Sequence, residues 1–308
     1  MVLAVNMQRL IIVYNPRSSR FVDVRREVLD KANELNGYLV GKYEIQNTNL
    51  EDNISKLAKI LKDSDLVLSV GGDATGVIAA NGILKSEKDA SLAALPYGNF
   101  NDLARTLRTN TFDDVFLSEA SVRKFYPLEI YIDDKFFRYA TCYVTIGMTA
   151  EAVKIYDTPK LRKKLKKSLG RNIGSYTELA KWYFKNRHGR IFIPEFKLNG
   201  VLQSKKTSDY AAVNGRSMAK VMKGGEDYRD AKFFRSETDR LTNFYRLVKL
   251  MSRSIFSRIP GTATSGDVLE FINPATITLQ AEGENHKFEN IKKIEVKKGK
   301  KWLKVIES

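Results

Sequence analysis

Two short glycine-bearing segments carry the residue types from which a phosphate-binding site could be built. The first follows the apolar run Leu66–Val70 and reads Gly71-Gly72-Asp73, after which Thr75 opens a helical pattern. Free N–H groups and the dipole at a helix N-terminus favour an anion at such a turn. A carboxylate such as Asp73 would repel phosphate unless a divalent cation lay between them, and a magnesium–nucleotide complex supplies that cation. The segment therefore predicts a nucleotide site, although glycine pairs also form plain turns.

The second segment follows the apolar run Ser91–Leu95 and contains Gly98, Asn101 and Asp102. Either Asn101 or Asp102 could cap a short helix that runs to Leu107. Ligands of α/β sheets bind at the carboxyl ends of the strands. Both glycine-bearing segments occupy such positions, so we expect the two loops to grip one nucleotide together.

The elements that would position these loops alternate between strand and helix through the first third of the chain. We expect a strand at Leu10–Tyr14, a helix at Val22–Leu35, a strand at Tyr38–Ile45, a helix after the capping-box pattern Thr48–Glu51, and then the two strands named above. This alternation predicts a doubly wound parallel sheet with helices on both faces. Residues 1–124 are therefore expected to form an α/β nucleotide-binding domain.

Strand patterns dominate from about residue 125 onward. They are Tyr126–Ile132, Phe136–Ile146, Arg190–Leu198, Asp209–Val213, Val268–Ile272, Ile277–Ala281, Ile291–Val296 and Trp302–Ile306, with a helix expected at Asp239–Ser252. Short strands in this number predict a β-sandwich. Residues 125–308 are therefore expected to form a second, β-rich domain, interrupted by a basic helical insertion at about 158–190.

The basic insertion concentrates a charge excess that runs through the whole chain. The net charge is +16, from 52 Lys and Arg against 36 Asp and Glu, and the insertion includes Lys163, Lys164, Lys166 and Lys167. Three interpretations are open: a solvated helical face, a surface that lies on an anionic membrane, or a nucleic-acid contact. We rank nucleic acid last among them.

Other chemistries are disfavoured by what the sequence lacks. Cys142 is the only cysteine, which argues against an internal disulfide and fits a reducing cytosol. With His188 and His286 as the only histidines, a Ser-His-Asp triad or a histidine-rich zinc site is not expected. No apolar run approaches the length of a membrane span, and no basic region precedes the apolar N-terminus as in a secretory signal.

Four motifs together resemble the diacylglycerol kinase catalytic-domain family, which includes bacterial soluble lipid kinases and sphingosine kinases. They are Tyr14-Asn15-Pro16, Gly71-Gly72-Asp73-Ala74-Thr75, the run Leu95–Arg105, and Glu282-Gly283-Glu284; Asn214-Gly215-Arg216 resembles a further segment of the family. The resemblance covers nearly the whole chain. It implies an α/β nucleotide domain and a β-sandwich lipid domain with the active site between them.

The resemblance also implies an activity, which is ATP-dependent phosphorylation of a lipid hydroxyl with Mg. ATP would contact Asn15, Gly71, Gly72, Thr75, Gly98 and Asn101. Asp73 would act through Mg, Glu282 would take the proton of the hydroxyl, and Glu284 would assist it or bind metal. Phosphoryl transfer consists mostly of positioning and charge neutralisation, so it needs no histidine.

Departures from the family pattern, three of them in or next to the motifs of the predicted site, leave rival interpretations open. Ala74 replaces a glycine, Asn99 replaces a threonine, and Glu282 stands in the position of an aspartate. A catalytically impaired nucleotide- or lipid-binding relative is one alternative. A kinase of a soluble hydroxyl substrate such as NAD is another, because NAD kinases share the Gly-Gly-Asp pattern. For a lipid kinase we expect a cytoplasmic protein that associates peripherally with an anionic membrane, and a homodimer is compatible with the sequence.

Overall fold

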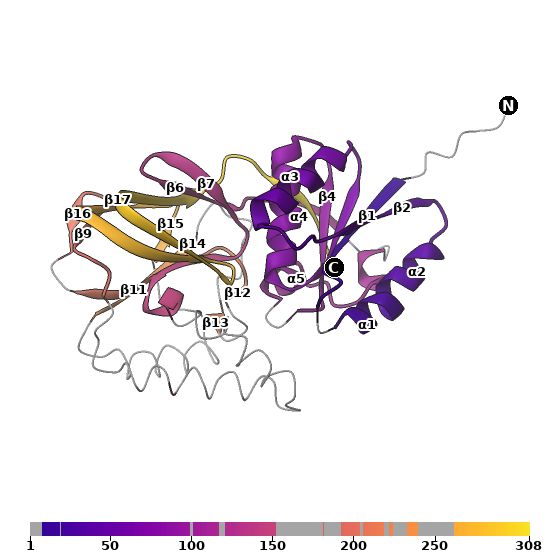
Figure 1. The fold of residues 1–308 in the computed structure, drawn as a ribbon, viewed down its shortest axis with the longest axis horizontal. Helices are drawn as coiled ribbons and strands as arrows, with labels where there is room; N and C mark the ends of the chain where they lie inside the picture. The colour runs from indigo at the N-terminus through magenta and orange to yellow at the C-terminus, as the bar shows by residue number, and fades with distance from the viewer. Residues whose placement is uncertain are drawn as a thin grey trace.

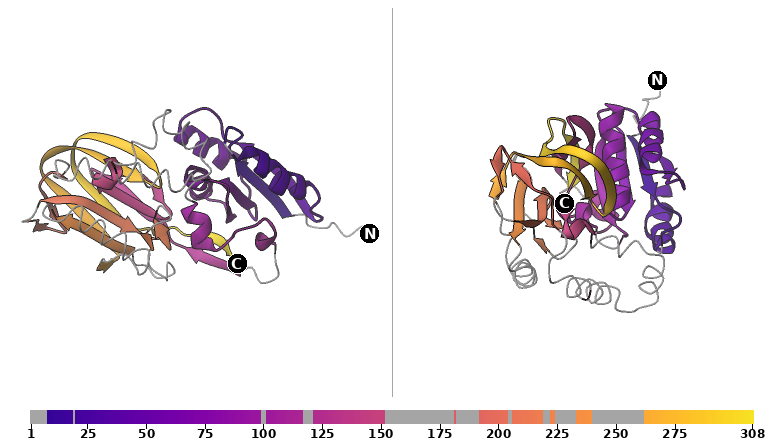
Figure 2. Two further views of the ribbon diagram at one scale, coloured as in Figure 1. Left: turned by 90° about the horizontal axis from the view of Figure 1, so that it is seen from below. Right: turned by 60° about the vertical axis from the view of Figure 1, so that its left-hand side comes forward.

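The computed structural model describes residues 8–18, 20–98, 101–116, 121–151, 181, 192–203, 206–218, 222–223, 233–239 and 262–308. Within them the chain forms a six-stranded sheet, a ten-stranded sheet and a small two-stranded hairpin. The two large sheets lie at opposite ends of the long axis of the molecule (Figures 1 and 2).

The first sheet is parallel except at one edge. Its strands are β1 (Gln8–Tyr14), β2 (Tyr38–Glu44), β3 (Leu66–Gly71), β4 (Ser91–Pro96), β5 (Ser121–Phe125) and β18 (Leu303–Glu307). They are ordered β2-β1-β3-β4-β18-β5, and only β5 runs antiparallel to its neighbour. The runs in β1, β3 and β4 are almost continuously buried, as expected for strands covered on both faces.

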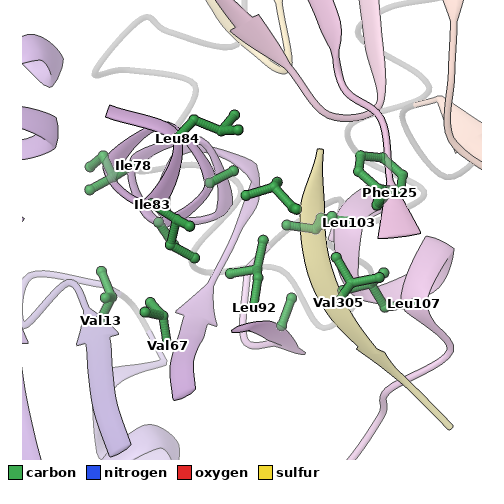
Figure 3. Packing of buried hydrophobic residues seen from close by; sticks show 14 of the residues in the cluster. Val13, Val67, Ile78, Ile83, Leu84, Leu92, Leu103, Leu107, Phe125 and Val305 are labelled. Carbon is green, nitrogen blue, oxygen red and sulfur yellow. The ribbon is translucent and has the colours of Figure 1, made fainter. Parts of the chain in front are cut away.

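Helices cover both faces of this sheet. On one face α3 (Leu50–Ile60), α4 (Asp73–Ser86) and α5 (Asp102–Leu107) share a core with the strands. Figure 3 shows the residues that α4 and α5 contribute to it. The opposite face is covered by α1 (Phe21–Val24), a π-helical turn (Arg25–Leu29), α2 (Asp30–Asn33) and a 3-10 turn (Asp113–Val115). The expected doubly wound layer is confirmed.

Helix α4 is buried along most of its length, from Thr75 to Leu84. It packs closely against α3, because a Cβ on Gly82 would come within 2.8 Å of the Leu57 Cδ2 atom. A helix enclosed in this way is a rigid support for Asp73, the residue at its N-terminus.

The second sheet is antiparallel throughout. Its strands are β6 (Leu128–Ile132), β7 (Lys135–Ala140), β8 (Tyr143–Gly147), β9 (Phe196–Leu198), β10 (Val201–Leu202), β11 (Thr207–Val213), β14 (Phe233–Asp239), β15 (Thr262–Thr264), β16 (Gly266–Ala281) and β17 (Glu284–Lys298). One core cluster joins residues from distant strands, among them Leu128, Val144, Tyr210 and Leu269. The separate antiparallel unit agrees with the predicted fold class. The small hairpin pairs β12 (Ser217–Met218) with β13 (Met222–Lys223).

Several element boundaries differ from those predicted. The two strands expected at Val268–Ile272 and Ile277–Ala281 are one strand, β16, whose pairing with β17 shifts register between Glu270 and Ala275. The shifted stretch includes Pro274, which has no backbone N–H to donate to the hydrogen-bond ladder. Of the strand expected at Arg190–Leu198, Phe196–Leu198 forms β9, residues 192–195 are not in a strand, and residues 190–191 lie outside the described part of the chain. Of the helix expected at Asp239–Ser252, Asp239 ends β14 instead, and residues 240–252 lie outside the described part of the chain.

The last strand crosses back to the first sheet, which differs from the predicted division at residue 124. β18 pairs in parallel with β4 and antiparallel with β5, and Val305 lies in the core of the first sheet (Figure 3). Residues 303–307 therefore extend the sheet of the N-terminal unit rather than the β-rich unit. Apart from this strand, the division into domains at residues 1–124 and 125–308 remains a prediction.

Other predicted features lie outside the described residues. Lys163, Lys164, Lys166 and Lys167 belong to this group, as does the insertion at 158–190 apart from Lys181, and so does Asn99. Among the helices of the described chain, none is both long enough and apolar enough to cross a membrane.

Candidate active site

The two glycine-bearing loops lie against each other at the carboxyl ends of β3 and β4. These strands are parallel neighbours whose last pair is Gly71 with Pro96, and the Tyr97 N–H donates to the Gly71 carbonyl at 3.1 Å. A Cβ added to Gly98 would lie 2.1 Å from the Cα of Gly72, so only glycine permits this approach. The loops therefore present one continuous backbone surface at the edge of the sheet.

The first loop opens α4 without a side-chain cap. Gly72 is the N-cap residue and has an extended backbone, with φ −98° and ψ −166°. Gly71 is required for packing, because its Cβ would lie 2.4 Å from the Oγ1 atom of Thr75, whose N–H donates to the Gly72 carbonyl at 3.0 Å. Ala74, which replaces a glycine of the family pattern, is exposed. An uncapped helix start favours an anion at this loop.

Two asparagines of the predicted nucleotide site shape its loops. The Asn101 side chain accepts from the Gly98 N–H at 2.7 Å and donates to the Gly98 carbonyl at 3.0 Å. Asn101 also adopts a left-handed backbone, with φ 61°, which asparagine tolerates better than most residues. At the end of β1, the Asn15 side chain accepts from the Arg17 N–H at 3.0 Å. Both amides therefore fix the backbone that a nucleotide would meet.

Three carboxyl groups gather beside the loops. The Oδ1 atom of Asp73 accepts from the Asp102 N–H at 2.8 Å, which joins the first turn of α4 to that of α5. Burial, followed by the nearby charge of Asp102, raises the pKa of Asp73 well above its usual range, and Glu282 adds to the effect. Asp102 is fully buried. The sequence predicted Asp102 only as a possible helix cap. Its position in the second glycine-bearing segment, at the end of the strand next to the Gly71-Gly72 pair, could have indicated a role in the site.

Glu282 reaches this cluster from the tight turn between β16 and β17. Ala281 pairs with Glu284, so Glu282 and Gly283 form a two-residue hairpin loop. Both have positive φ, 50° and 87°, which is the pattern of a type I′ turn. Glutamate rarely adopts this conformation. Strained residues of this kind concentrate at functional sites, which supports a functional interpretation of Glu282.

The Glu282 carboxyl group is buried and only half satisfied. The Thr141 hydroxyl and the Cys142 N–H donate to Oε1, whereas Oε2 is buried with no hydrogen-bond partner among the described residues. Burial raises its pKa from 4.5 to about 7, against the opposing effect of the two hydrogen bonds. A carboxylate with this pKa can accept a proton near neutral pH. Thr141 and Cys142 lie far from Glu282 in sequence, and their role was not predicted.

The Asn214-Gly215-Arg216 segment supports the same region. The N–H groups of Asn214 and Gly215 donate to the Cys142 carbonyl at 2.7 and 3.0 Å. A Cβ on Gly215 would lie 2.7 Å from the Oγ1 atom of Thr106 in α5. The segment thus joins the strand ends of the second sheet to the helix that begins at Asp102.

The cluster fits a magnesium ion that is shared with phosphate. Besides burial, the charges of Asp102 and Glu282 raise the pKa of Asp73, and the charge of Asp102 raises the pKa of Glu282, so a bound cation would stabilise the ionised carboxylates. Among the described residues, no group of three or more metal-ligating side chains is close enough to hold a metal by itself. Mg²⁺ commonly takes one or two protein carboxylates and completes its shell with substrate phosphates and water.

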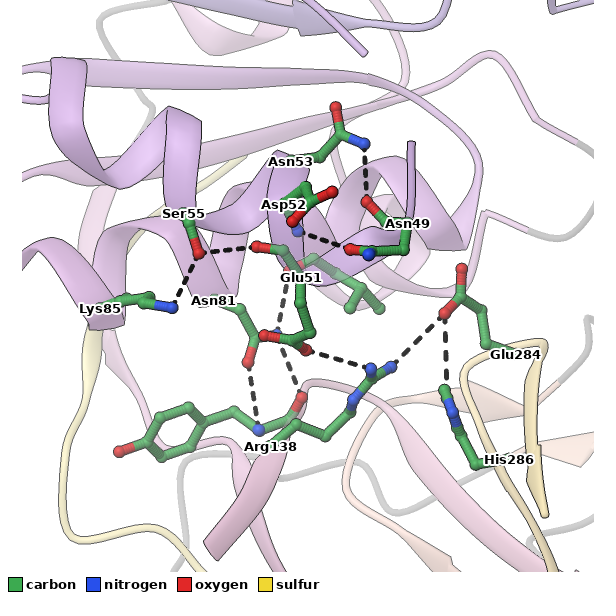
Figure 4. Close-up of polar contacts among 12 residues, drawn as sticks. Asn49, Glu51, Asp52, Asn53, Ser55, Asn81, Lys85, Arg138, Glu284 and His286 are labelled. Atoms are coloured by element: carbon green, nitrogen blue, oxygen red, sulfur yellow. Dashed lines mark hydrogen bonds and ion pairs between the residues drawn. The ribbon is translucent and has the colours of Figure 1, made fainter. Parts of the chain in front are cut away.

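Glu284 points into a different set of contacts. Its Oε2 lies 3.5 Å from a guanidinium nitrogen of Arg138 and 3.9 Å from the His286 Nε2 atom (Figure 4). Arg138 also pairs with Glu51 of α3 at 3.2 Å. The structure therefore brings Glu282 to the aspartates, and it pairs Glu284 with a buried arginine. The metal-binding or assisting role of Glu284 stays a prediction.

Comparison with known proteins confirms the resemblance drawn from the motifs. Residues 9–124 match the family model of the diacylglycerol kinase catalytic domain. A diacylglycerol kinase structure from Bacillus anthracis strain Sterne superposes with a TM-score of 0.68 at 16% identity, covering 98% of this chain and 97% of the other. Two structures named as provisional diacylglycerol kinases of that strain give TM-scores of 0.70 and 0.64 at 16% and 15% identity, each covering 98% of this chain and 97% and 98% of their own.

At these identities the structural likeness shows a shared fold. Among curated proteins, none matches the sequence significantly. The family model covers residues 9–124, and the bacterial structures share the fold of nearly the whole chain.

Proposed function

Because residues 9–124 match the diacylglycerol kinase catalytic domain, we propose that the protein is an ATP-dependent lipid kinase that transfers the γ-phosphate to a hydroxyl of a diacylglycerol-like lipid. The observation that carries the proposal is the contact of the two glycine loops beside three carboxyl groups. Backbone N–H groups at the loops suit the phosphates, and the carboxyl groups suit a metal and a base.

Each residue of the site has a proposed role. The loops at Gly71, Gly72 and Gly98 bring the backbone close to the triphosphate, with Thr75 behind them and Asn15 and Asn101 fixing their shape. Asp73 is the protein ligand for Mg, with Asp102 beside it. When bound, Mg would neutralise phosphate charge.

Glu282 is the proposed base. Its Oε2 atom takes the proton of the lipid hydroxyl, because Thr141 and Cys142 already occupy Oε1. Glutamate is one methylene longer than the aspartate of the family pattern, and in this turn its carboxyl group contacts the Thr141 hydroxyl. General-base catalysis of this kind contributes roughly a hundredfold to ten-thousandfold in rate.

The proposal extends to where the protein works. A lipid substrate implies a membrane surface, and the basic residues Lys163, Lys164, Lys166 and Lys167 are the proposed contact with anionic lipid. We place such a protein in the cytoplasm, bound peripherally to the membrane.

Labelled ATP and a lipid panel test the proposal. Diacylglycerol, phosphatidylglycerol and a sphingoid base are offered in mixed micelles with Mg, and incorporation of labelled phosphate is measured. Wild type should label one lipid, and Asp73→Asn and Glu282→Gln should each lose about a hundredfold or more. Asp63→Asn is the matched control, since Asp63 forms an exposed pair with Lys88 at 3.2 Å and its loss should leave the rate unchanged.

Two outcomes would replace the proposal. Binding of Mg-ATP by calorimetry without any turnover would identify a non-catalytic relative. Phosphate transfer to NAD or another soluble hydroxyl compound, with none to lipid, would identify a soluble acceptor.

A further inference from the structure

Two consecutive residues of β7, Arg138 and Tyr139, contact the two elements that carry the carboxyl groups of the candidate active site: α4, which begins at Asp73, and the hairpin that contains Glu282. On one side, the Tyr139 N–H donates to Asn81 Oδ1 at 3.1 Å, and Asn81 Nδ2 donates to the Tyr139 carbonyl at 3.1 Å. Asn81 is 6% exposed and lies in α4, the helix that begins at Asp73. A paired amide of this kind fixes α4 against the backbone of the second sheet.

On the other side, the Arg138 guanidinium bridges two carboxylates. It pairs with Glu51 in the first turn of α3 at 3.2 Å and with Glu284 at 3.5 Å (Figure 4). Arg138 is 3% exposed, and its guanidinium carbon lies 4.6 Å from the centroid of the Phe137 ring. Glu284 follows Glu282 by two residues in the same hairpin. The turn that carries the proposed base is thereby fixed to the same strand as α4.

We propose that Arg138 and Asn81 are positioning residues that set the distance between Asp73 and Glu282. The kinetic part of this inference rests on the proposed function. Asp73 begins α4, which packs on the first sheet, whereas Glu282 lies in a hairpin turn of the second sheet. Units of one chain move relative to each other unless their interface is large and apolar. Contacts from adjacent residues of one strand, one to α4 and one to the Glu282 turn, restrict that motion where it would separate the groups.

A purely stabilising role explains the arrangement less well. Transferring an arginine from water to the protein interior on folding costs free energy that its ion pairs often fail to recover. Glu51 is also 55% exposed at its side chain, so solvent weakens that pair. A planar guanidinium between two carboxylates does fix geometry, because its donors have set directions.

Steady-state kinetics with the labelled lipid test the positioning role. Arg138→Met should lower kcat by about a hundredfold, since a small misplacement of catalytic groups has this effect, while KM for ATP stays unchanged. Arg138→Lys should recover part of the loss, because one ammonium group can pair with only one carboxylate at a time. Arg123→Met is the matched control: Arg123 pairs with Glu307 at 2.8 Å within the first sheet, so its removal should not change kcat.

A distance measurement tests the same inference without catalysis. Cys142 is buried, so cysteines introduced as Lys59→Cys in α3 and Lys292→Cys in β17 can be spin-labelled selectively. Double electron–electron resonance then reports the distance between the two spin labels, and so between the two units. The distribution should be narrow in the parent and in Arg123→Met, and clearly broader in Arg138→Met and in Asn81→Ala.

The outcomes separate this inference from the proposed function. An unchanged distance distribution in folded Arg138→Met and Asn81→Ala would overturn it, as would a fall in kcat that follows only the loss of melting temperature. Absence of turnover in wild type would contradict the kinase proposal, and the distance measurement would still decide the positioning role. If Arg138→Met does not fold, Glu51→Gln takes its place, because it removes one pair at a half-exposed position and should broaden the distribution in the same direction.

Discussion

At the residue scale, Glu282 combines two features that each reduce stability. It adopts a left-handed backbone in a two-residue turn, and its carboxyl group is buried with Oε2 unpaired among the described residues. A buried unpaired polar atom costs roughly 1–3 kcal/mol. Asp209 is a second buried carboxyl group, whose pKa burial raises to about 7 although two hydrogen bonds from Thr149 oppose the shift. Both groups bind a proton more tightly in the folded chain than in the unfolded chain.

The free energy of unfolding is therefore expected to fall as pH rises from about 4.5 to about 7. The folded state keeps the Glu282 proton over this range and the unfolded state releases it, which favours unfolding by up to about 3 kcal/mol at neutral pH. Urea unfolding of wild type and Glu282→Gln across this range measures the effect. The variant should show a shallower pH dependence, with the remainder due to Asp73 and Asp209, whose pKa values burial also raises. Equal slopes in both proteins would contradict the assigned burial of Glu282.

Gly98 is the second residue on which the site depends. In Gly98→Ala the new methyl group would lie 2.1 Å from the Cα of Gly72 and 2.6 Å from its nitrogen, and backbone atoms cannot rotate away. The two loops must separate, at a cost of about 1–3 kcal/mol, and their joint hold on the triphosphate is lost. Calorimetry should show Mg-ATP affinity at least about tenfold weaker, since small displacements of a binding group have large effects. Unchanged affinity would show that the loops do not act together on the nucleotide.

At the element scale, α3 shows how a local signal can be misplaced by one residue. The capping-box pattern predicted Thr48 as the cap, yet the N-cap is Asn49, whose side chain accepts from the Asp52 N–H at 2.8 Å. Asn49→Ala should therefore lower the free energy of unfolding by about 1 kcal/mol. Thr48→Ala is the control and should have the smaller effect, because Thr48 Oγ1 accepts from the Asn53 side chain at 3.1 Å and donates to the Asn49 carbonyl at 3.5 Å, and neither bond caps a backbone N–H of α3. A larger effect at Thr48 would instead identify Thr48 as the residue that caps α3.

Elements whose signals are local were predictable from sequence. The buried runs of β3 and β4 follow from apolar periodicity, and the helix after Asn101 follows from its capping residue. The helix expected from Thr75 is α4, which begins at Asp73. The contact of Thr141 and Cys142 with Glu282 was not predictable in this way, because it joins positions about 140 residues apart through the pairing of β8 with β16. Strand register between distant segments leaves no trace in local periodicity.

At the scale of the whole molecule, the chain returns to its first sheet at its end. β18 lies between β4 and β5, and β5 has no other partner strand in the described part of the chain. Leu303 and Val305 are fully buried in the core shared with α3, α4 and α5. The family match ends at residue 124, whereas the sheet it belongs to is completed by residues 303–307.

A fragment of residues 1–124 is therefore expected not to fold cooperatively. It would lose the buried Leu303 and Val305, each contributing about 1.5–3 kcal/mol, and it would leave β4 as an exposed edge, with β5 unpaired. Losses of this size are comparable to the whole stability of a small domain, about 5–15 kcal/mol. Urea unfolding followed by circular dichroism should give a broad transition for the fragment. Joining residues 299–308 after residue 124 through a flexible glycine–serine linker should restore a sigmoidal transition, because it supplies the missing strand. A sharp transition in the fragment alone would show that β18 is dispensable to the nucleotide-binding unit.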